Sequence, residues 1–188
     1  MAAAPPGRGH NRGPALEPGR GWRLHCWTKA RADLLPTLPI EILRNRVRRA
    51  AELGLDYRTY ASVWASTGHD VVAFLFSSNA LRVFPGQGLP ADRAARLERL
   101  AVGRIGLAQG RLLPDALLAA AGGLLEGAHP APPPFAGWSE QRRRLRTALG
   151  RIPSDQVILV GDAAGEREWA EAARLAGYIA AEHYMPAG

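Results

Sequence analysis

The residues best suited to chemistry lie in one short segment towards the C-terminus. Asp162 follows the apolar run 157–160 and Gly161, and Glu166 comes shortly afterwards, where a helical pattern begins. This order predicts a buried strand, a tight turn and an amphipathic helix. In open α/β sheets ligands bind at the carboxyl ends of the strands, where two carboxylates could hold Mg²⁺ or a hydroxyl group. The competing interpretation is that Asp162 only caps the turn or the helix.

A second polar group follows the apolar segment 71–76. Ser77, Ser78 and Asn79 come directly after it, and a short apolar run bounded by turn residues favours a buried strand. Periodicity alone also permits a helix, which Asp70 could cap. If the segment is a strand, the three polar side chains follow its carboxyl end.

The segment 154–178 resembles the fourth motif of the haloacid dehalogenase superfamily. In that family a strand ends in Gly-Asp, a second acid follows three or four residues later, and the next helix ends near Ala-Gly. Here these features are Gly161-Asp162, Glu166 and Ala176-Gly177, and Ser77-Ser78-Asn79 is similar to the family's phosphate-binding Ser/Thr at a strand end. The resemblance implies a phosphate site with Mg²⁺ held by Asp162 and Glu166.

The chain departs from this family at the first motif, an Asp-x-Asp pair after an N-terminal strand that supplies the nucleophile. Asp70 precedes its predicted strand, and Asp33 and Asp56 have no strand before them. Covalent catalysis fails without a nucleophile. The resemblance therefore implies a non-catalytic or degenerate α/β protein that binds a phosphate-type anion or Mg²⁺ at its strand ends. An active member would be a Mg²⁺-dependent phosphoryl hydrolase.

Basic residues outnumber acidic ones by 24 to 17, and Lys29 is the single lysine. The bias towards arginine is typical of a GC-rich bacterial genome, but a net charge of +7 still predicts attraction to polyanions. Arginine binds phosphate groups bidentately and stacks on bases. The candidate polyanion-binding residues lie in two predicted Arg-rich helices, and they are Arg44, Arg46, Arg48, Arg49, Arg142, Arg143 and Arg144.

The alternative function is therefore that of a basic cytoplasmic accessory protein. It would bind nucleic acid or an acidic protein partner through an N-terminal arm and the Arg-rich helices. The competing interpretation of the same arginines is a set of solvated helix faces paired with acids. Cys26 is the single cysteine, which excludes an intrachain disulfide and favours the cytoplasm. No apolar run is long enough for a transmembrane helix, so no membrane association is expected.

The pattern along the chain predicts an α/β fold. Residues 1–21 are rich in Pro, Gly and Arg and are expected to form a disordered basic arm, with a single domain over 22–188. Two or three short buried strands among many helices predict a small Rossmann-like parallel sheet flanked by helices. Region 85–137 is expected to form a helical insertion or cap. The expected helices span 39–53, 57–67, 91–102, 115–125 and 139–149.

Overall fold

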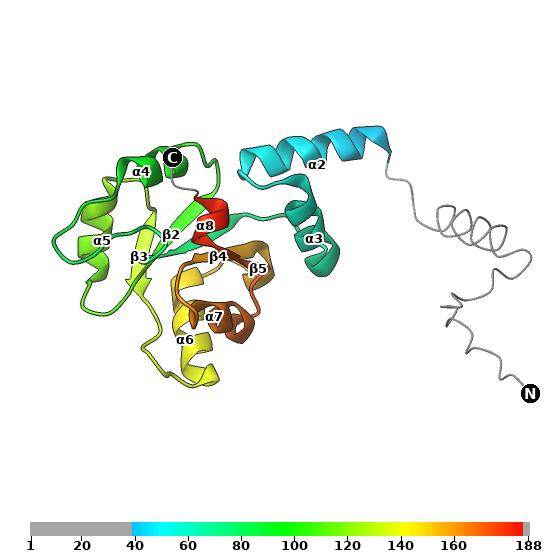
Figure 1. The fold of residues 1–188 in the computed structure, drawn as a ribbon. Coiled ribbons are helices and arrows are strands. Elements are labelled where there is room, and N and C mark those ends of the chain that lie inside the picture. The colour runs from blue at the N-terminus through cyan, green and yellow to red at the C-terminus, as the bar shows by residue number, and fades with distance from the viewer. Residues whose placement is uncertain (1–38, 186–188) are drawn as a thin grey trace, which may run out of the picture. The chain divides into compact units, whose positions relative to one another are not determined.

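The structure is a computed structural model that describes residues 39–185. The predicted basic arm and the residues up to 38 lie outside the described residues. The described part contains one sheet of five strands in the order β3-β2-β1-β4-β5, and every neighbouring pair is parallel (Figure 1). Helices connect the strands, so the predicted Rossmann-like α/β fold is confirmed. The strands are β1 (Ala73–Ser77), β2 (Gly103–Ala108), β3 (Gly127–Pro130), β4 (Val157–Gly161) and β5 (Gly177–Ala180).

The two central strands are apolar throughout because both faces of the sheet are covered. Strand β1 has the sequence AFLFS and β4 has VILVG, and every residue of both is buried. A parallel sheet between two helical layers requires such continuous runs rather than an alternation of polar and apolar residues. Ala73 of β1 pairs in register with Val157 of β4. The predicted strand at 71–76 is therefore confirmed, and it begins at Ala73.

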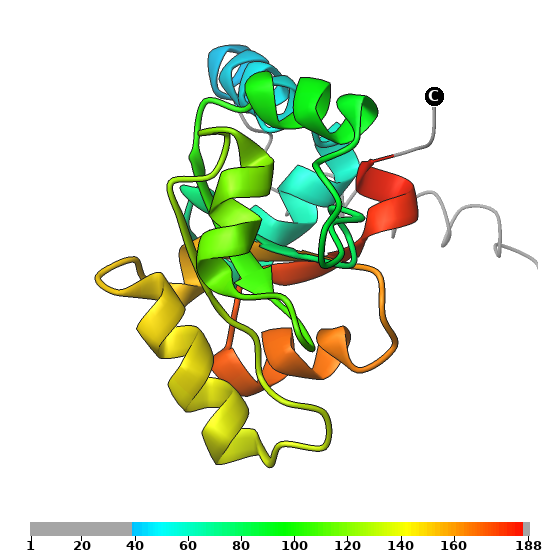
Figure 2. The same ribbon diagram turned by 90° about the vertical axis from the view of Figure 1, so that its left-hand side faces the viewer.

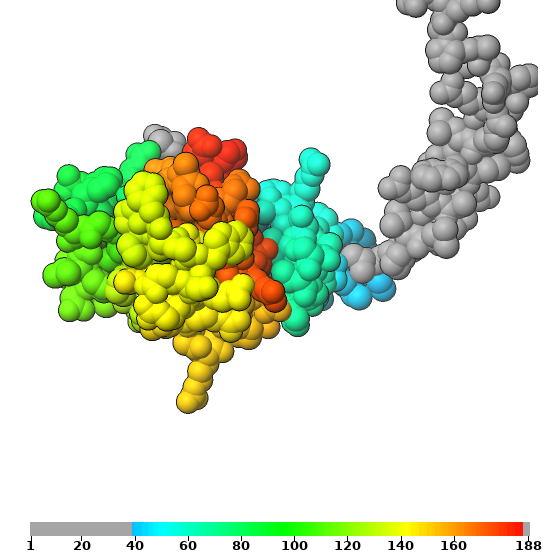
Figure 3. All heavy atoms as spheres, turned by 90° about the horizontal axis from the view of Figure 1, so that it is seen from below, coloured from blue at the N-terminus to red at the C-terminus, as the bar shows by residue number. Residues whose placement is uncertain are grey.

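Helices cover the sheet in two layers (Figure 2). Phe74, Phe76 and Ile158 pack in one core cluster, whereas Leu75 and Leu159 point into the other, because successive strand residues face opposite sides. The first layer contains α2 (Ile40–Glu52), α3 (Tyr57–Thr67), α4 (Ala91–Glu98), α5 (Pro114–Ala121) and α8 (Ala181–Tyr184). The second contains α6 (Trp138–Leu149) and α7 (Glu166–Ala173), which cover the face seen in Figure 3. A short 3₁₀ turn, η1 (Ser154–Gln156), leads into β4.

Region 85–137 is not a helical insertion or cap, because it supplies β2 and β3 as well as α4 and α5. Strand β2, GRIGLA, contains two glycines and β3 is the short segment GAHP, so neither shows the β-branched run typical of a buried strand. The glycine at 106 has a packing reason. A Cβ there would lie 2.7 Å from Cδ2 of Leu117 and 2.9 Å from Cδ1 of Leu125. Glycine thus lets α5 lie close against β2.

Two other details differ from the sequence prediction. Helix α4 ends at Glu98 rather than near 102, because the chain must turn into β2. Helix α6 begins at Trp138, one residue before the predicted start, and its N-cap is Gly137, without a side-chain cap. No helix among residues 39–185 is long and apolar enough to cross a membrane.

Buried tyrosine hydroxyls join the N-terminal helices to the rest of the core. The hydroxyl of Tyr60 donates to Oδ1 of Asp70 at 3.0 Å, and that of Tyr184 donates to the carbonyl of Leu53 at 2.8 Å. Burial, helped by the hydrogen bond to Asp70, raises the pKa of Tyr60 to about 12. Burial also raises the pKa of Tyr184 well above its ordinary value.

Because both pKa values are raised on folding, we expect stability to fall as the pH rises from about 10 towards about 12. The neutral tyrosines stabilise the fold fully below the unfolded pKa, and this contribution disappears as they ionise. The double variant Tyr60→Phe/Tyr184→Phe should be less stable at pH 8, because hydrogen bonds are lost, but should show a shallower alkaline decline. Urea midpoints at several pH values measure this. Parallel curves for the two proteins would contradict it.

Candidate functional site

The carboxyl ends of β1 and β4 form the topological switch point of the sheet. The chain passes from β1 to β2 and β3 on one side, and α6 then carries it back to β4 on the other side of β1. Ligands of open α/β sheets bind in the crevice at such a point. Ser77 ends β1 and Gly161 ends β4. The two polar groups selected from the sequence therefore do meet at one edge.

The centre of this edge is the buried carboxylate of Glu166, which is 1% exposed. Its Oε1 accepts hydrogen bonds from Nδ2 of Asn79 at 3.1 Å and from Nε2 of Gln109 at 2.7 Å. Its Oε2 accepts from the backbone N–H of Asp162 at 2.7 Å. The donors come from the segments that follow β1, β2 and β4. A buried charge needs such partners, so Glu166 fastens three strand ends together.

Gln109 is a site residue that the sequence did not reveal. It follows β2, which was not recognised as a strand, and a lone glutamine carries no motif. Its Oε1 accepts from the backbone N–H of Asn79 at 3.2 Å and from Oγ of Ser78 at 3.4 Å. Its own backbone N–H donates to Oγ of Ser78 at 3.2 Å. Gln109 therefore links the turn after β1 to Glu166.

The predicted anion-binding serines are engaged in the turn after β1. Ser77 is fully buried, and its Oγ accepts from the backbone N–H of Ala80 at 3.1 Å. Ser78 is buried as well and bonds to Gln109 as described. Asn79 directs its amide to Glu166. These residues lie at the predicted edge, but their hydrogen-bonding groups order the protein itself.

The predicted metal pair is not arranged as a metal centre. Asp162 is exposed, whereas both oxygens of Glu166 already accept hydrogen bonds. Mg²⁺ takes near-octahedral oxygen ligands, and a metal bound by Glu166 would have to displace amide donors. Within residues 39–185, no group of three or more His, Cys, Asp or Glu side chains could hold a metal ion. The donor set therefore does not fit Mg²⁺.

Gly161 makes room for the buried carboxylate. A Cβ at this position would overlap Oε2 of Glu166 and lie 2.7 Å from Cε2 of Tyr178 in β5. Burial and the nearby charge of Glu166 raise the pKa of the Tyr178 hydroxyl. The glycine of the Gly-Asp pair thus has a structural cause, because it admits Glu166, whereas residue 162 binds Glu166 only through its backbone N–H.

A cavity of about 590 Å³ lies beside this cluster. One wall is the loop after β3, which includes residues 132–136, and the other is the start of α7 with Trp169. Gln109 and Glu166 of the strand-end cluster line it too, together with Glu168 and Gln141. The composition of this loop is typical of a proline-rich linker. In the structure it forms the rim of the cavity.

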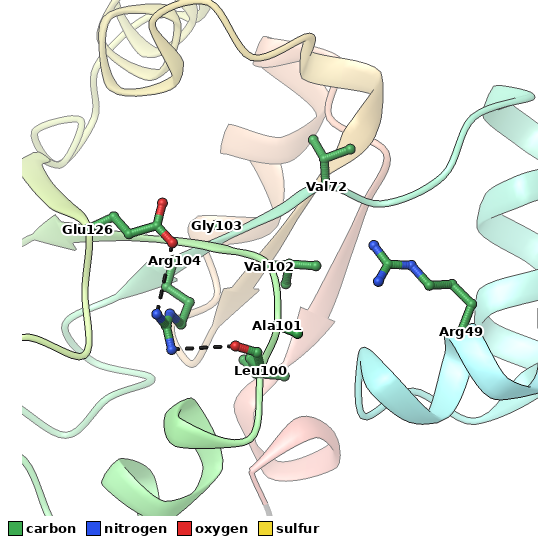
Figure 4. A pocket seen from close by; sticks show the side chains of 8 residues that line it. All are labelled: Arg49, Val72, Leu100, Ala101, Val102, Gly103, Arg104 and Glu126. Atoms are coloured by element: carbon green, nitrogen blue, oxygen red, sulfur yellow. Dashed lines mark hydrogen bonds and ion pairs between the residues drawn. The ribbon is translucent and has the colours of Figure 1, made fainter.

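A second hollow, of about 440 Å³, lies at the amino ends of the strands (Figure 4). Its two arginines already have partners. Arg49 donates to Asp70 at 2.8 Å, and Arg104 donates to the carbonyl of Leu97 at 3.0 Å and lies 3.9 Å from Glu126. This hollow is at the opposite edge from Glu166, and its charges are largely balanced.

The predicted polyanion-binding arginines lie in two layers of the molecule. Those of α2 and those of α6 belong to helices on opposite faces of the sheet (Figure 1), so they do not form one patch. Most are paired locally. The partners are Glu41 for Arg44, Asn45 for Arg48, Asp70 and Glu52 for Arg49, the carbonyl of Ala172 for Arg142, and Glu140 for Arg143 and Arg144, while Arg46 lies over the ring of Trp64. Their role in binding polyanions stays a prediction.

Comparisons of the chain with family models, with curated proteins and with solved structures find no match. The function is therefore inferred from the geometry of the site.

Substituting Gly161 by alanine should destabilise the protein by about 1–3 kcal/mol, because the new methyl group overlaps Glu166 and presses on Tyr178. Gly165→Ala is the matched control, since no heavy atom lies within 4 Å of a Cβ there and its φ is −75°. Urea unfolding gives both free energies. Equal stability of the two variants would show that Glu166 is not held against Gly161.

Replacing Glu166 by glutamine should also lower the free energy of unfolding, by about 1–3 kcal/mol. The carboxylate accepts hydrogen bonds on both oxygens, and an NH₂ group at either position faces a donor. Glu171→Gln, an exposed change on the same helix, should have little effect. A wild-type melting midpoint for Glu166→Gln would mean that the cluster does not hold the strand ends.

Proposed function

We propose that this chain is a degenerate, non-catalytic protein of the haloacid dehalogenase type that binds a small ligand at the carboxyl edge of its sheet. The strand order supports a new assignment of its motifs. Strand β1 is the first strand of the described chain and lies at the centre of the sheet. The family's Asp-x-Asp follows an N-terminal strand, and here that place is held by Ser77-Ser78-Asn79. These residues then replace the nucleophile motif rather than represent the phosphate-binding Ser/Thr.

The observation that carries the proposal is the set of hydrogen bonds around Glu166. An aspartate at position 79 would place a second carboxylate against that of Glu166, and two such charges repel. Asn79 is nearly isosteric with aspartate but donates a hydrogen bond to Oε1 of Glu166 instead. Gln109 adds a second amide donor at 2.7 Å. An edge that would hold metal and nucleophile in an enzyme is thus closed by neutral amides.

Neither serine is placed to act as a nucleophile. A serine hydroxyl needs an adjacent general base. The Oγ of Ser77 accepts from a backbone N–H, and that of Ser78 bonds to the side-chain amide and backbone of Gln109. An amide is not a base, and Ser77 is fully buried. The cluster supports binding and structure rather than phosphoryl transfer.

The adjoining cavity is the element that suits a ligand. Its volume of about 590 Å³ lies within the range of small-molecule sites. Residues that follow β2, β3 and β4 line it, at the carboxyl edge where such folds bind ligands. Gln109 and Glu166 form part of its wall. The cluster therefore gives the cavity a rigid floor.

Hydrolysis of p-nitrophenyl phosphate in the presence of Mg²⁺ tests the proposal that this protein is not a catalyst. We expect no turnover above the buffer rate, with wild type and Asp162→Asn indistinguishable, because the site has no activated nucleophile. Turnover that disappears in Asp162→Asn would overturn the proposal and make the chain a Mg²⁺-dependent hydrolase.

Mg²⁺ or a phosphate-type anion, the ligands predicted from the sequence, can be tested on the same proteins. A ligand that binds only the folded state raises the thermal midpoint with concentration. A rise with Mg²⁺ plus phosphate that is lost in Asp162→Asn would assign them to this edge. We expect no such rise, because the oxygens of Glu166 are already engaged.

A further inference from the structure

We infer that the cavity beside Glu166 binds a small organic cation, an ammonium or guanidinium group on an apolar body. The inference rests on the proposed binding function and specifies its ligand. Three properties of the cavity wall point to the same chemistry: its charges, its hydrogen-bonding groups and its aromatic rings.

The ionisable side chains of the lining are both acidic. They are Glu166 and Glu168, and no arginine, lysine or histidine of residues 39–185 lines the cavity. This occurs in a chain with 24 basic and 17 acidic residues, so the local balance is the reverse of the overall one. Glu166 is buried, where a charge is poorly screened by water. An anionic ligand would be repelled here, and a cation attracted.

One residue of the cavity wall carries a buried acceptor that has no donor among the described residues. Gln141 is 5% exposed, and its Nε2 donates to the carbonyl of Ala136 at 2.8 Å. That bond fixes which end of the amide is the oxygen, and Oε1 is buried without a hydrogen-bond partner. Unpaired buried acceptors are uncommon. This oxygen is closed to solvent, so a donor in the cavity would reach it only after the side chain of Gln141 turns.

The loop that forms the rim offers acceptors rather than donors. Residues 132–134 are three consecutive prolines, which have carbonyl groups but no N–H. An ammonium or guanidinium group only donates hydrogen bonds and therefore suits the proline carbonyls of this wall.

Aromatic rings supply the remaining contacts. Trp169 lies in the wall, and Phe135 stands at the rim with its side chain fully exposed. The backbone of Phe135 has a φ of +61°, a left-handed conformation that is unfavourable for a residue with a Cβ. The turn thus holds a bare aromatic ring at the rim. Aromatic faces attract cations and pack against apolar groups. The two rings therefore suit both the charged group and the apolar body of the proposed ligand.

Titration calorimetry with phenethylamine and with 2-phenylethanol compares a cation with a neutral molecule of nearly the same shape. We expect the amine to bind about tenfold more tightly or better, as for a hydrogen bond involving a charged group. Glu168→Gln should weaken amine binding about two- to fivefold, as for an exposed charge pair, and should leave the alcohol unaffected. Glu171→Gln, exposed on the same helix and outside the cavity, is the matched control.

The variant Gly165→Trp tests whether the ligand binds in the cavity. Gly165 lines the cavity and has open space around it, so a tryptophan there should fill the cavity and abolish binding without unfolding the protein. Acetyl-arginine amide, titrated in parallel, distinguishes a peptide side chain from a free amine as the source of the cation. If amine and alcohol bind equally, and both are lost in Gly165→Trp, the cation inference fails while the binding function stands. If amine, alcohol and acetyl-arginine amide all fail to bind, or if Gly165→Trp leaves binding unchanged, the cavity is not the site and both fail.

Discussion

The buried charge of Glu166 is the constraint on which the carboxyl edge of this fold depends. A carboxylate that is 1% exposed is costly unless hydrogen bonds replace its water. Asn79, Gln109 and the N–H of Asp162 provide those bonds, and Gly161 provides the space. The presence of Asn79, Gln109 and Gly161 thus follows from one charged group, whereas any residue with a backbone N–H would serve at position 162. The turn after β1 is ordered by the same group, because Gln109 is held between it and Glu166.

The sequence is most informative where the residues that determine an element lie within that element or directly beside it. The run 157–160, the glycine turn and the helix after it lie within a few residues of one another, so strand β4 and the position of its acids could be predicted. The helices α2 and α3 were also within reach, because α3 is capped by Asp56 and ends at Gly68 in the left-handed conformation. Strands β2 and β3 were not, since their identity depends on long-range pairing. Glycine at 106 is explained by α5 and not by its neighbours in the chain.

The candidate site shows the same difference between local and long-range determinants. Asp162, Glu166 and Asn79 were selected correctly as neighbours, but their relationship was not foreseen, because a hydrogen bond spanning 87 residues leaves no local pattern. Gln109 was missed together with β2. The proline-rich stretch near 133 looks like a linker in composition, and only the fold shows that it borders a cavity. The positions of the site residues could therefore be predicted from the sequence better than their chemical roles.

Charge is distributed unevenly over this molecule. Exposed arginines on α2 and α6 have nearby acids and contribute little to stability individually. The acids of the cavity have no basic neighbour in the part of its lining that the structure describes. The wall of the cavity is therefore locally acidic in a chain whose net charge is +7. Such separation allows one small protein to present two different electrostatic environments.

The ends of the sheet have a consequence for how this protein meets copies of itself. The two edge strands, β3 and β5, are four residues long, and β3 ends in Pro130. A strand from another chain that approached β3 would find a short ladder whose last residue has no N–H to give. Short, proline-ended edges are a common protection against edge-to-edge aggregation. Pairing of β3 with a strand from another copy is therefore disfavoured.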